Sequence, residues 1–202
     1  MTDLARLLLA RACLQQGFDR VIWVDADVVI FSPDLLQLDR NLSYGFSREV
    51  WVYKDDLGKV SVSVRVNNSV CMFCNDHIGR RILDQYISAC ISTVEGLPQV
   101  QDHTEVGTKL LTSLDREAPL PILNGFGLVS PLIIQALLTR DDDLLTQFMY
   151  HQGAPLYAVN LCNFFRAHQL DQLGIIPDGV FLAVLDELLT SKGSILNARM
   201  RT

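Results

Sequence analysis

The stretch DRVIWVDADVVIF, residues Asp19–Phe31, decides the fold class. It sets two acidic residues, Asp25 and Asp27, between two runs of four apolar residues each. The first run, Val21 to Val24, is continuously apolar and rich in β-branched residues, which is typical of a strand buried on both faces in a largely parallel sheet. We therefore expect a buried strand to end at the acidic pair and a second strand to follow it.

The flanking sequence predicts helices and strands in alternation. Upstream, Leu4, Leu7, Leu8 and Leu14 form the apolar stripe of a helix that begins near Thr2 and ends near glycine 17. Downstream, the patterns predict strands at 60–66, 69–74 and 155–162, a turn at 67–68, and helices at 77–93, 104–114, from 130–131, from 141–143 and at 179–190. This order indicates one α/β domain over residues 1–202, with a mixed, mainly parallel sheet flanked by helices.

The composition limits the classes of function. The chain has 202 residues, 49% of them hydrophobic and 20% charged, which is the composition of a globular protein. Its net charge of −6 provides no basic footprint for nucleic acid. No apolar run approaches the roughly 20 residues of a transmembrane helix. Five cysteines, with Cys71 and Cys74 as the only close pair, are expected to be free thiols in the cytoplasm, with a peripheral membrane location left open.

The acidic pair carries the chemistry. Residues i and i+2 of a strand point the same way, so Asp25 and Asp27 are expected to project together from the strand's end. Two adjacent carboxylates raise each other's pKa unless a cation neutralises them, and Mg²⁺ or Mn²⁺ suits such oxygen ligands. Ligands of α/β sheets also gather at the carboxyl ends of strands. The alternative is that the two acids cap a turn or pair with an arginine.

The stretch from residue 2 to 38, TDLARLLLARACLQQGFDRVIWVDADVVIFSPDLLQL, resembles the D-x-D region of GT-A fold glycosyltransferases. Those enzymes share a helix with D-x-x-R, a lead-in similar to GFDRVI, and a strand followed by D-x-D. The resemblance implies a GT-A-like (Rossmann-like) fold. It implies that Asp3 and Arg6 help to bind the donor, that Asp27 ligates the metal, and that Asp25 contacts the ribose or a metal-bound water. Without the resemblance, Asp3 and Arg6 could be a surface ion pair.

Weaker matches lie farther along the chain. VNNSVCMF, residues 66–73, resembles a strand on the acceptor side of these enzymes, and Asp102 with Glu105 resembles their acidic segment. Alternatively, those two acids stabilise a helix N-terminus. Asn160 stands where many members of the family have a metal-binding histidine, so the resemblance makes it the third ligand, through an amide oxygen, with His151 and His168 as the alternatives.

One part of the family pattern is missing. In GT-A enzymes, βαβ units that form most of the nucleotide pocket precede the D-x-x-R helix, whereas here the helix begins at residue 2. A sheet without those strands exposes its edge. We therefore expect weak donor binding, or an oligomer or partner that covers this edge.

These observations predict a metal-dependent glycosyltransferase. It would move a sugar from a UDP- or GDP-type donor to a hydroxyl of a glycan, lipid or protein, and the metal would stabilise the departing diphosphate. Asp102 or Glu105 would be the base of an inverting reaction. One alternative is an inactive glycosyltransferase-like scaffold or partner subunit. A second is a haloacid dehalogenase-type phosphatase with Asp25 as nucleophile and Asp27 as acid/base. That family has a later apolar strand that ends in an acidic pair, whereas the acidic residues 141–143 follow what the sequence indicates is the end of a helix.

Overall fold

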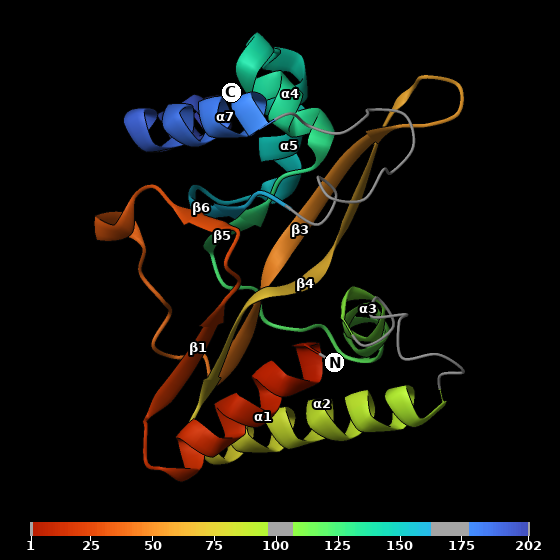
Figure 1. Ribbon diagram of the computed structural model, residues 1–202, viewed down its shortest axis with the longest axis vertical. Coiled ribbons are helices and arrows are strands. Elements are labelled where there is room, and N and C mark those ends of the chain that lie inside the picture. Colours follow the sequence, from red (N-terminus) through yellow and green to blue (C-terminus); the bar gives the residue numbers. More distant parts are fainter. Residues whose placement is uncertain (1, 97–106, 163–177, 202) are drawn as a thin grey trace. The chain divides into compact units, whose positions relative to one another are not determined.

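The structure is a computed structural model that describes residues 2–96, 107–162 and 178–201. The chain folds into helices and strands, of which β3 and β4 are the longest (Figure 1). The first half contains α1 (Thr2–Gln15), β1 (Arg20–Val24), β2 (Val28–Ile30), the 3-10 turn η1 (Pro33–Leu35), β3 (Tyr44–Lys54), β4 (Val60–Cys74) and α2 (His77–Gly96). The second half contains α3 (Thr108–Glu117), β5 (Gly125–Leu128), α4 (Pro131–Thr139), α5 (Asp142–Gln152), β6 (Leu156–Asn160), α7 (Asp178–Ser191), α8 (Ser194–Asn197) and the 3-10 turn η3 (Ala198–Arg201).

The contacts within the chain fall into two compact units. Unit 1 comprises Met1–Val24, Asp39–Ser47 and Arg65–Leu123, and unit 2 comprises Asp25–Leu38, Arg48–Val64 and Asn124–Thr202. Strands β3 and β4 contribute residues to both units. The mixed α/β class is confirmed, while the single domain expected from the sequence stays a prediction.

Unit 1 is built on the strand order β1-β4-β3. Strand β1 runs antiparallel to β4, with Arg20 opposite Cys74 and Val24 opposite Val70. Helices α1 and α2 lie side by side (Figure 1) and pack with α3 against one face of these strands. The core of this unit consists of Leu7, Ala10, Leu14, Phe46, Val66, Cys71, Phe73, Leu83, Tyr86, Ile87, Cys90 and Leu111.

The expectation that β1 is buried on both faces of a largely parallel sheet is wrong. Val21 and Trp23 pack against the core of unit 1, but Ile22 and Val24, on the other face, are 40% and 38% exposed. The physical reason is that β1 is an edge strand, covered by helices on one face only and paired only with the antiparallel β4 among the described strands.

Unit 2 contains the strand order β2-β6-β5. Strand β2 is antiparallel to β6, whereas β5 is parallel to β6. Helices α4, α5, α7 and α8 pack against these strands around a core that includes Phe31, Ile133, Phe148 and Val159. The β1–β4 and β2–β6 pairs are antiparallel and the β5–β6 pair is parallel, which differs from the mainly parallel sheet expected.

Strand β4 corrects a second expectation. The sequence predicts a turn at Asn67 and Asn68 between two strands, but one continuous strand runs through both residues. Each asparagine is only 7% exposed, because hydrogen bonds from neighbouring elements satisfy the two amides inside the sheet.

Strands β3 and β5 were not predicted at all. All five cysteines are free, as expected, and none of the described helices has the length and hydropathy needed to cross a bilayer.

Asp76 caps the N-terminus of α2. The Asp76 carboxylate accepts a hydrogen bond of 2.7 Å from the Gly79 N–H. This bond, with further help from the Ser43 side chain, holds the pKa of Asp76 below its ordinary value of 3.8, although partial desolvation opposes the shift. Because the pKa is lowered in the folded state, the cap contributes stability above the unfolded value and loses it as pH falls through the folded value.

We expect Asp76→Ala to lower the free energy of unfolding by about 1 kcal/mol at pH 7. The difference from the wild type should shrink as pH falls below 3.8, because the protonated carboxyl is a weaker acceptor. Urea unfolding at pH 7 and at pH 3 measures both values. Asp76→Asn is the matched control, since an amide oxygen also caps helices. A difference between wild type and Asp76→Ala that does not change with pH would contradict the role of the charge.

Candidate functional site

The acidic pair lies in a turn between two strands of different sheets. Asp25 directly follows β1, Asp27 directly precedes β2, and the Val28 N–H donates to the Asp25 carbonyl over 3.1 Å. Both side chains are half-buried. The pair therefore stands at the end of β1, as expected. The expectation that both side chains point the same way relied on the alternation of an extended strand, but the two residues lie in a turn, where this alternation does not apply.

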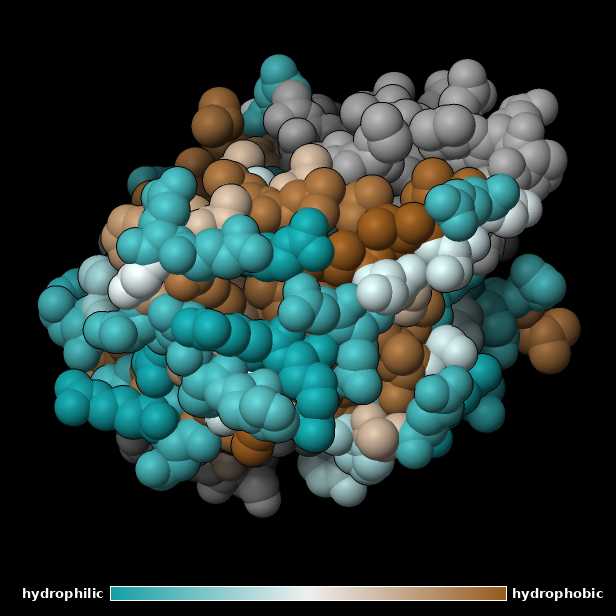
Figure 2. Space-filling view, turned by 90° about the horizontal axis from the view of Figure 1, so that it is seen from below, coloured by the Kyte–Doolittle hydropathy of each residue, from teal (hydrophilic) through white to brown (hydrophobic). Residues whose placement is uncertain are grey.

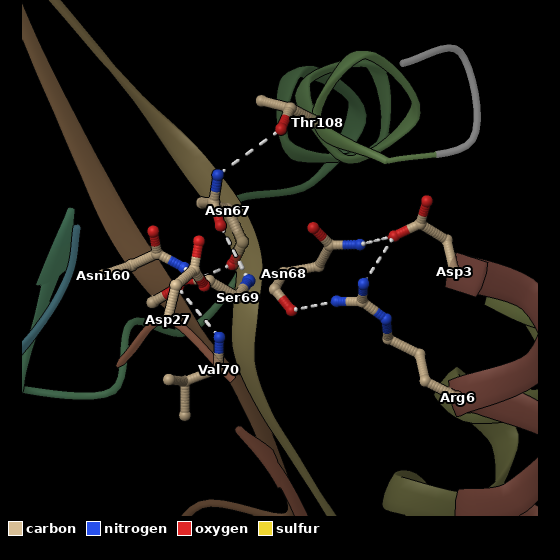
Figure 3. A network of polar contacts seen from close by, with 10 residues as sticks. Asp3, Arg6, Asp27, Asn67, Asn68, Ser69, Val70, Thr108 and Asn160 are labelled. Carbon is tan, nitrogen blue, oxygen red and sulfur yellow. Dashed lines mark hydrogen bonds and ion pairs between the residues drawn. The ribbon is translucent and has the colours of Figure 1, made fainter. Parts of the chain in front are cut away.

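Asp27 is fixed by Asn160, which the sequence analysis had placed in the same site. The Asn160 amide nitrogen donates to the Asp27 carboxylate over 2.8 Å (Figure 3). The two backbones are also joined, because Val28 lies opposite Asn160 in the β2–β6 pair and the Leu161 N–H donates to the Asp27 carbonyl over 3.0 Å. This arrangement holds one carboxylate in place beside a buried amide.

The orientation of the Asn160 amide is defined by a second bond. Its oxygen accepts the Cys162 N–H over 2.6 Å, so turning the amide around would set one donor against another. Asn160 therefore presents nitrogen to Asp27 and oxygen to the backbone. In this orientation it positions the carboxylate of Asp27, and its predicted role as a third metal ligand, which needs the oxygen, stays a prediction.

The residues of this turn suit a hard divalent cation. Two half-buried carboxylates in a three-residue turn provide the oxygen ligands that Mg²⁺ and Mn²⁺ prefer, and such ions keep several waters or bind phosphate oxygens in addition. Among the residues that the structure describes, no three His, Cys, Asp or Glu side chains form a metal-binding group. A cation here would thus depend on water or on a ligand's oxygens to complete its coordination.

Asn160→Asp tests whether this position lies beside a cation. The new carboxylate would stand next to that of Asp27 and raise the pKa of one of the two acids. The free energy of unfolding should fall by about 1–3 kcal/mol at pH 7. Because the folded pKa is raised, this loss should appear as pH rises above about 4 and disappear below it.

Millimolar MnCl₂ should reduce the loss at pH 7, because a cation between the carboxylates cancels their repulsion. Thermal unfolding with and without MnCl₂ measures the effect. Asn160→Ala, which removes the same hydrogen bonds without adding charge, should show a loss that MnCl₂ does not reduce. The proposed cation site beside Asp27 is contradicted if Mn²⁺ leaves the loss in free energy of unfolding of Asn160→Asp unchanged.

A second polar group lies within unit 1 and joins α1 to β4. Arg6 and Asp3 form an ion pair of 3.2 Å, and the Asn68 amide nitrogen donates to the same Asp3 oxygen over 2.7 Å. Arg6 also donates to the Asn68 carbonyl over 2.9 Å, and its guanidinium lies 5.2 Å from the centre of the Trp23 ring. The two side chains are only 9% and 13% exposed, so the ion pair of the alternative reading forms, but it is largely buried and not at the surface.

Further polar residues of unit 1 hold β4 in place. The Asn67 amide nitrogen donates to the Thr108 hydroxyl of α3 over 3.4 Å, and its oxygen accepts the Ser69 N–H over 2.7 Å (Figure 3). The Ser47 hydroxyl of β3 lies 3.0 Å from the Ser69 hydroxyl and donates to the Asn67 carbonyl. Residues 67–69 of β4 are thus surrounded by hydrogen bonds.

Sequence reasoning missed two buried polar residues of β3. Ser47 and Glu49 are 0% and 3% exposed. The sequence SREVWVY, residues 47–53, could have indicated them, because Ser47 and Glu49 alternate with residues of an apolar strand pattern. Because the strand itself was not predicted, neither residue was considered.

The other predicted residues lie elsewhere. Asp102 and Glu105 fall outside the described residues. A hollow of about 830 Å³ in unit 1 is lined by polar and charged residues between Asn75 and Ser88, and no predicted site residue lines it.

Comparison of the sequence with models of known protein families and with curated proteins finds no match. The functional assignment therefore depends on the geometry of the two polar groups and on the resemblance carried by residues 2–38.

Proposed function

We propose that this protein is a metal-dependent glycosyltransferase of the GT-A type, which moves a sugar from a nucleotide-diphosphate donor to a hydroxyl acceptor. The observation that carries the proposal is Asp27, held by Asn160 in a turn that contains a second carboxylate. Such a fixed pair is suited to a divalent cation that binds a diphosphate. Mn²⁺ or Mg²⁺ is the cofactor proposed, and a UDP- or GDP-type sugar is the donor.

Each residue has a distinct task in this proposal. When bound, the cation would act as a Lewis acid that stabilises the negative charge of the leaving diphosphate. Asp25 and Asp27 hold that cation, and Asn160 keeps Asp27 in the orientation that binding requires. Asp3 and Arg6 are assigned to the donor by the resemblance, and Asn68 fixes both side chains. Asp102 or Glu105 would accept the proton of the acceptor hydroxyl in an inverting reaction.

Isothermal titration calorimetry with UDP and GDP, in the presence and absence of MnCl₂, tests the proposal. We expect heat of binding from at least one of the nucleotides only when Mn²⁺ is present, because the cation bridges the carboxylates and the diphosphate. Nucleotide binding of equal strength without the cation would contradict the assigned role of the acidic pair. Donor hydrolysis or transfer, followed by release of the nucleotide diphosphate, then measures activity.

A second candidate is an inactive glycosyltransferase-like module that serves as a scaffold or partner subunit. The observation that favours it is Asn160, which turns nitrogen toward Asp27 and oxygen toward the Cys162 backbone. In this orientation the amide oxygen is not turned toward the Asp27 carboxylate. This candidate predicts no Mn²⁺-dependent nucleotide binding in the same titration.

The phosphatase alternative finds no support in the acidic residues 141–143. Asp141 caps α5 by accepting the Leu144 N–H over 3.1 Å, and Asp142 pairs with Arg199. These acids therefore have structural partners at a helix start. An assay with a generic aryl phosphate remains the direct test of this alternative, and we expect no turnover.

A further inference from the structure

Two hollows adjoin in unit 1, where β4 passes into α2. The larger extends along α2 as far as Ser88 and has a volume of about 830 Å³. The smaller, bordered by residues 19–20 and 40–43, has a volume of about 320 Å³. Asn75 and Asp76 line both hollows. Each volume is within the range of small-molecule sites, which is roughly 300–1,000 Å³.

The lining of the two hollows is rich in positive charge. Four arginines contribute to it, two in each hollow: Arg20 and Arg40 in the smaller, Arg80 and Arg81 in the larger. The lining also contains three aspartates: Asp19, Asp76 and Asp84. Figure 2 looks onto the side of unit 1 formed by α1 and α2 and shows hydrophilic residues gathered there. Positive charges thus exceed negative ones at this place, although the whole chain has a net charge of −6.

Two of the four guanidinium groups are held in place by the junction of β4 and α2. Arg20 donates from Nε to the Cys74 sulfur over 3.3 Å, and Arg80 donates from Nε to the Asn75 amide oxygen over 2.5 Å. The Asn75 amide nitrogen donates to the Leu14 carbonyl over 3.1 Å, which fixes its oxygen toward Arg80. Because a guanidinium has five N–H donors, both arginines keep their outer N–H groups for another acceptor.

Two of the acids of the lining are compensated by other parts of the chain. Asp76 accepts an N–H of the first turn of α2, and Asp84 forms an ion pair of 3.7 Å with Arg11, which lines neither hollow. By contrast, Arg40 and Arg81 are exposed and make no hydrogen bond or ion pair within the part of the chain that the structure describes. The hollows therefore offer more N–H donors than the chain itself uses, which favours an anionic ligand.

We propose that the two hollows, together called the arginine hollow, bind a small molecule with two phosphate groups, one for each pair of arginines. A guanidinium donates two parallel hydrogen bonds to a phosphate, and a doubly charged phosphate suits two guanidinium groups. The polar lining favours a multiply charged ligand over an apolar one. The arginine hollow belongs to unit 1, whereas Asp25 and Asp27 belong to unit 2, so the proposal does not depend on the proposed cation site.

NMR titration of the ¹⁵N-labelled chain with fructose 1,6-bisphosphate in EDTA tests the proposal. EDTA removes divalent cations, so the acidic turn takes no part and a negative result leaves the proposed function standing. We expect the Nε–Hε signals of Arg20 and Arg80 to shift as the ligand binds. Inorganic phosphate should bind at least about 10-fold more weakly, because it contacts one arginine pair only. Raising NaCl from about 20 to 200 mM should weaken binding of the bisphosphate at least about fivefold, because salt screens exposed charges.

Arg40→Gln and Arg81→Gln each remove one charge, and they do so in different hollows. Each should weaken binding of the bisphosphate about fivefold or more. Arg116→Gln is the matched control, because Arg116 is an exposed arginine of α3 in unit 1 that lines neither hollow. It should leave the affinity within about twofold of the wild type, since charges farther apart than the Debye length are screened.

The results that would overturn the proposal are distinct. One is the absence of shifts at Arg20 and Arg80 up to about 10 mM bisphosphate, which is weaker than millimolar affinity. Another is an equal loss in the Arg116→Gln control. If only one of the two hollow variants weakens binding, the assignment of one phosphate to each arginine pair is wrong. A short DNA duplex and phosphatidylserine vesicles are the competing ligands, and tighter binding of either one, lost in the same variants, would replace the small molecule as the ligand.

Discussion

Asp27→Asn is expected to lower Mn²⁺-dependent sugar transfer by at least about 100-fold, which corresponds to about 2.7 kcal/mol of transition-state stabilisation. The substitution keeps the size of the side chain and one oxygen that can accept the bond from Asn160. It removes the negative charge that holds the cation in the proposed function. The expected loss is therefore electrostatic, and the fold should be unaffected.

Initial rates of nucleotide release at saturating donor, measured against MnCl₂ concentration, test this expectation. The variant should also require more Mn²⁺ for its residual activity. Asp56→Asn is the matched control, because Asp56 is exposed in the β3–β4 turn, belongs to the same unit and loses the same charge. Wild-type rates in Asp27→Asn, or an equal loss in Asp56→Asn, would contradict the assignment of the site. Calorimetry of the variant with Mn²⁺ and UDP or GDP separates lost binding from lost chemistry.

Gly79→Ala is expected to destabilise the protein by about 3 kcal/mol or more, the upper range for overpacking a close contact. A Cβ at this position would come within 2.3 Å of the Cys74 carbonyl oxygen and 2.6 Å of the Ser43 carbonyl oxygen. Both neighbours are backbone atoms, and the Cys74 N–H donates to that Ser43 oxygen. Relief of the clash would therefore need movement of the first turn of α2 away from the strands.

Gly96→Ala, in the same helix, is the control that is not expected to lower the free energy of unfolding. No atom lies within 4 Å of a Cβ at the end of α2, so alanine should be neutral or stabilise by up to about 1 kcal/mol through its higher helix propensity. Urea unfolding of both variants measures the contrast. If Gly79→Ala is as stable as the wild type, α2 does not approach the backbone of β4 as closely as described.

Much of the helical structure was predictable, because helix ends are marked by local chemistry. Asp76 and Asp141 cap α2 and α5, and glycine 17, with a φ of +96°, lies just beyond α1, near the helix end that the sequence predicts. Asp3 with Arg6 was also recognisable from a spacing of three residues. In each case the interacting groups lie within one helical turn of one another in the sequence.

The strands were predicted less well, because their environment depends on distant residues. An apolar run such as Val21–Val24 shows that a strand forms but not whether one or both of its faces are covered. The turn expected at Asn67 is absent because Thr108, 41 residues away, accepts the hydrogen bond of its amide. Of the candidate site, the proximity of Asp27 and Asn160 followed from the family pattern, whereas the direction of the Asn160 amide depends on the local bond to Cys162.

The hydrogen bonds of Asn160 couple a side chain to a backbone conformation. Cys162 has a φ of +54°, a left-handed conformation that is costly for a residue with a Cβ, and its N–H is held by the amide that also orients Asp27. A movement of the Asp27 carboxylate is therefore expected to change the backbone dihedral angles of Cys162, just after β6. By thermodynamic reciprocity, a change in the Cys162 backbone conformation changes the affinity of the Asp27 carboxylate for a ligand. Cys162, two residues after Asn160, is thus expected to influence the acidic turn through the Asn160 amide.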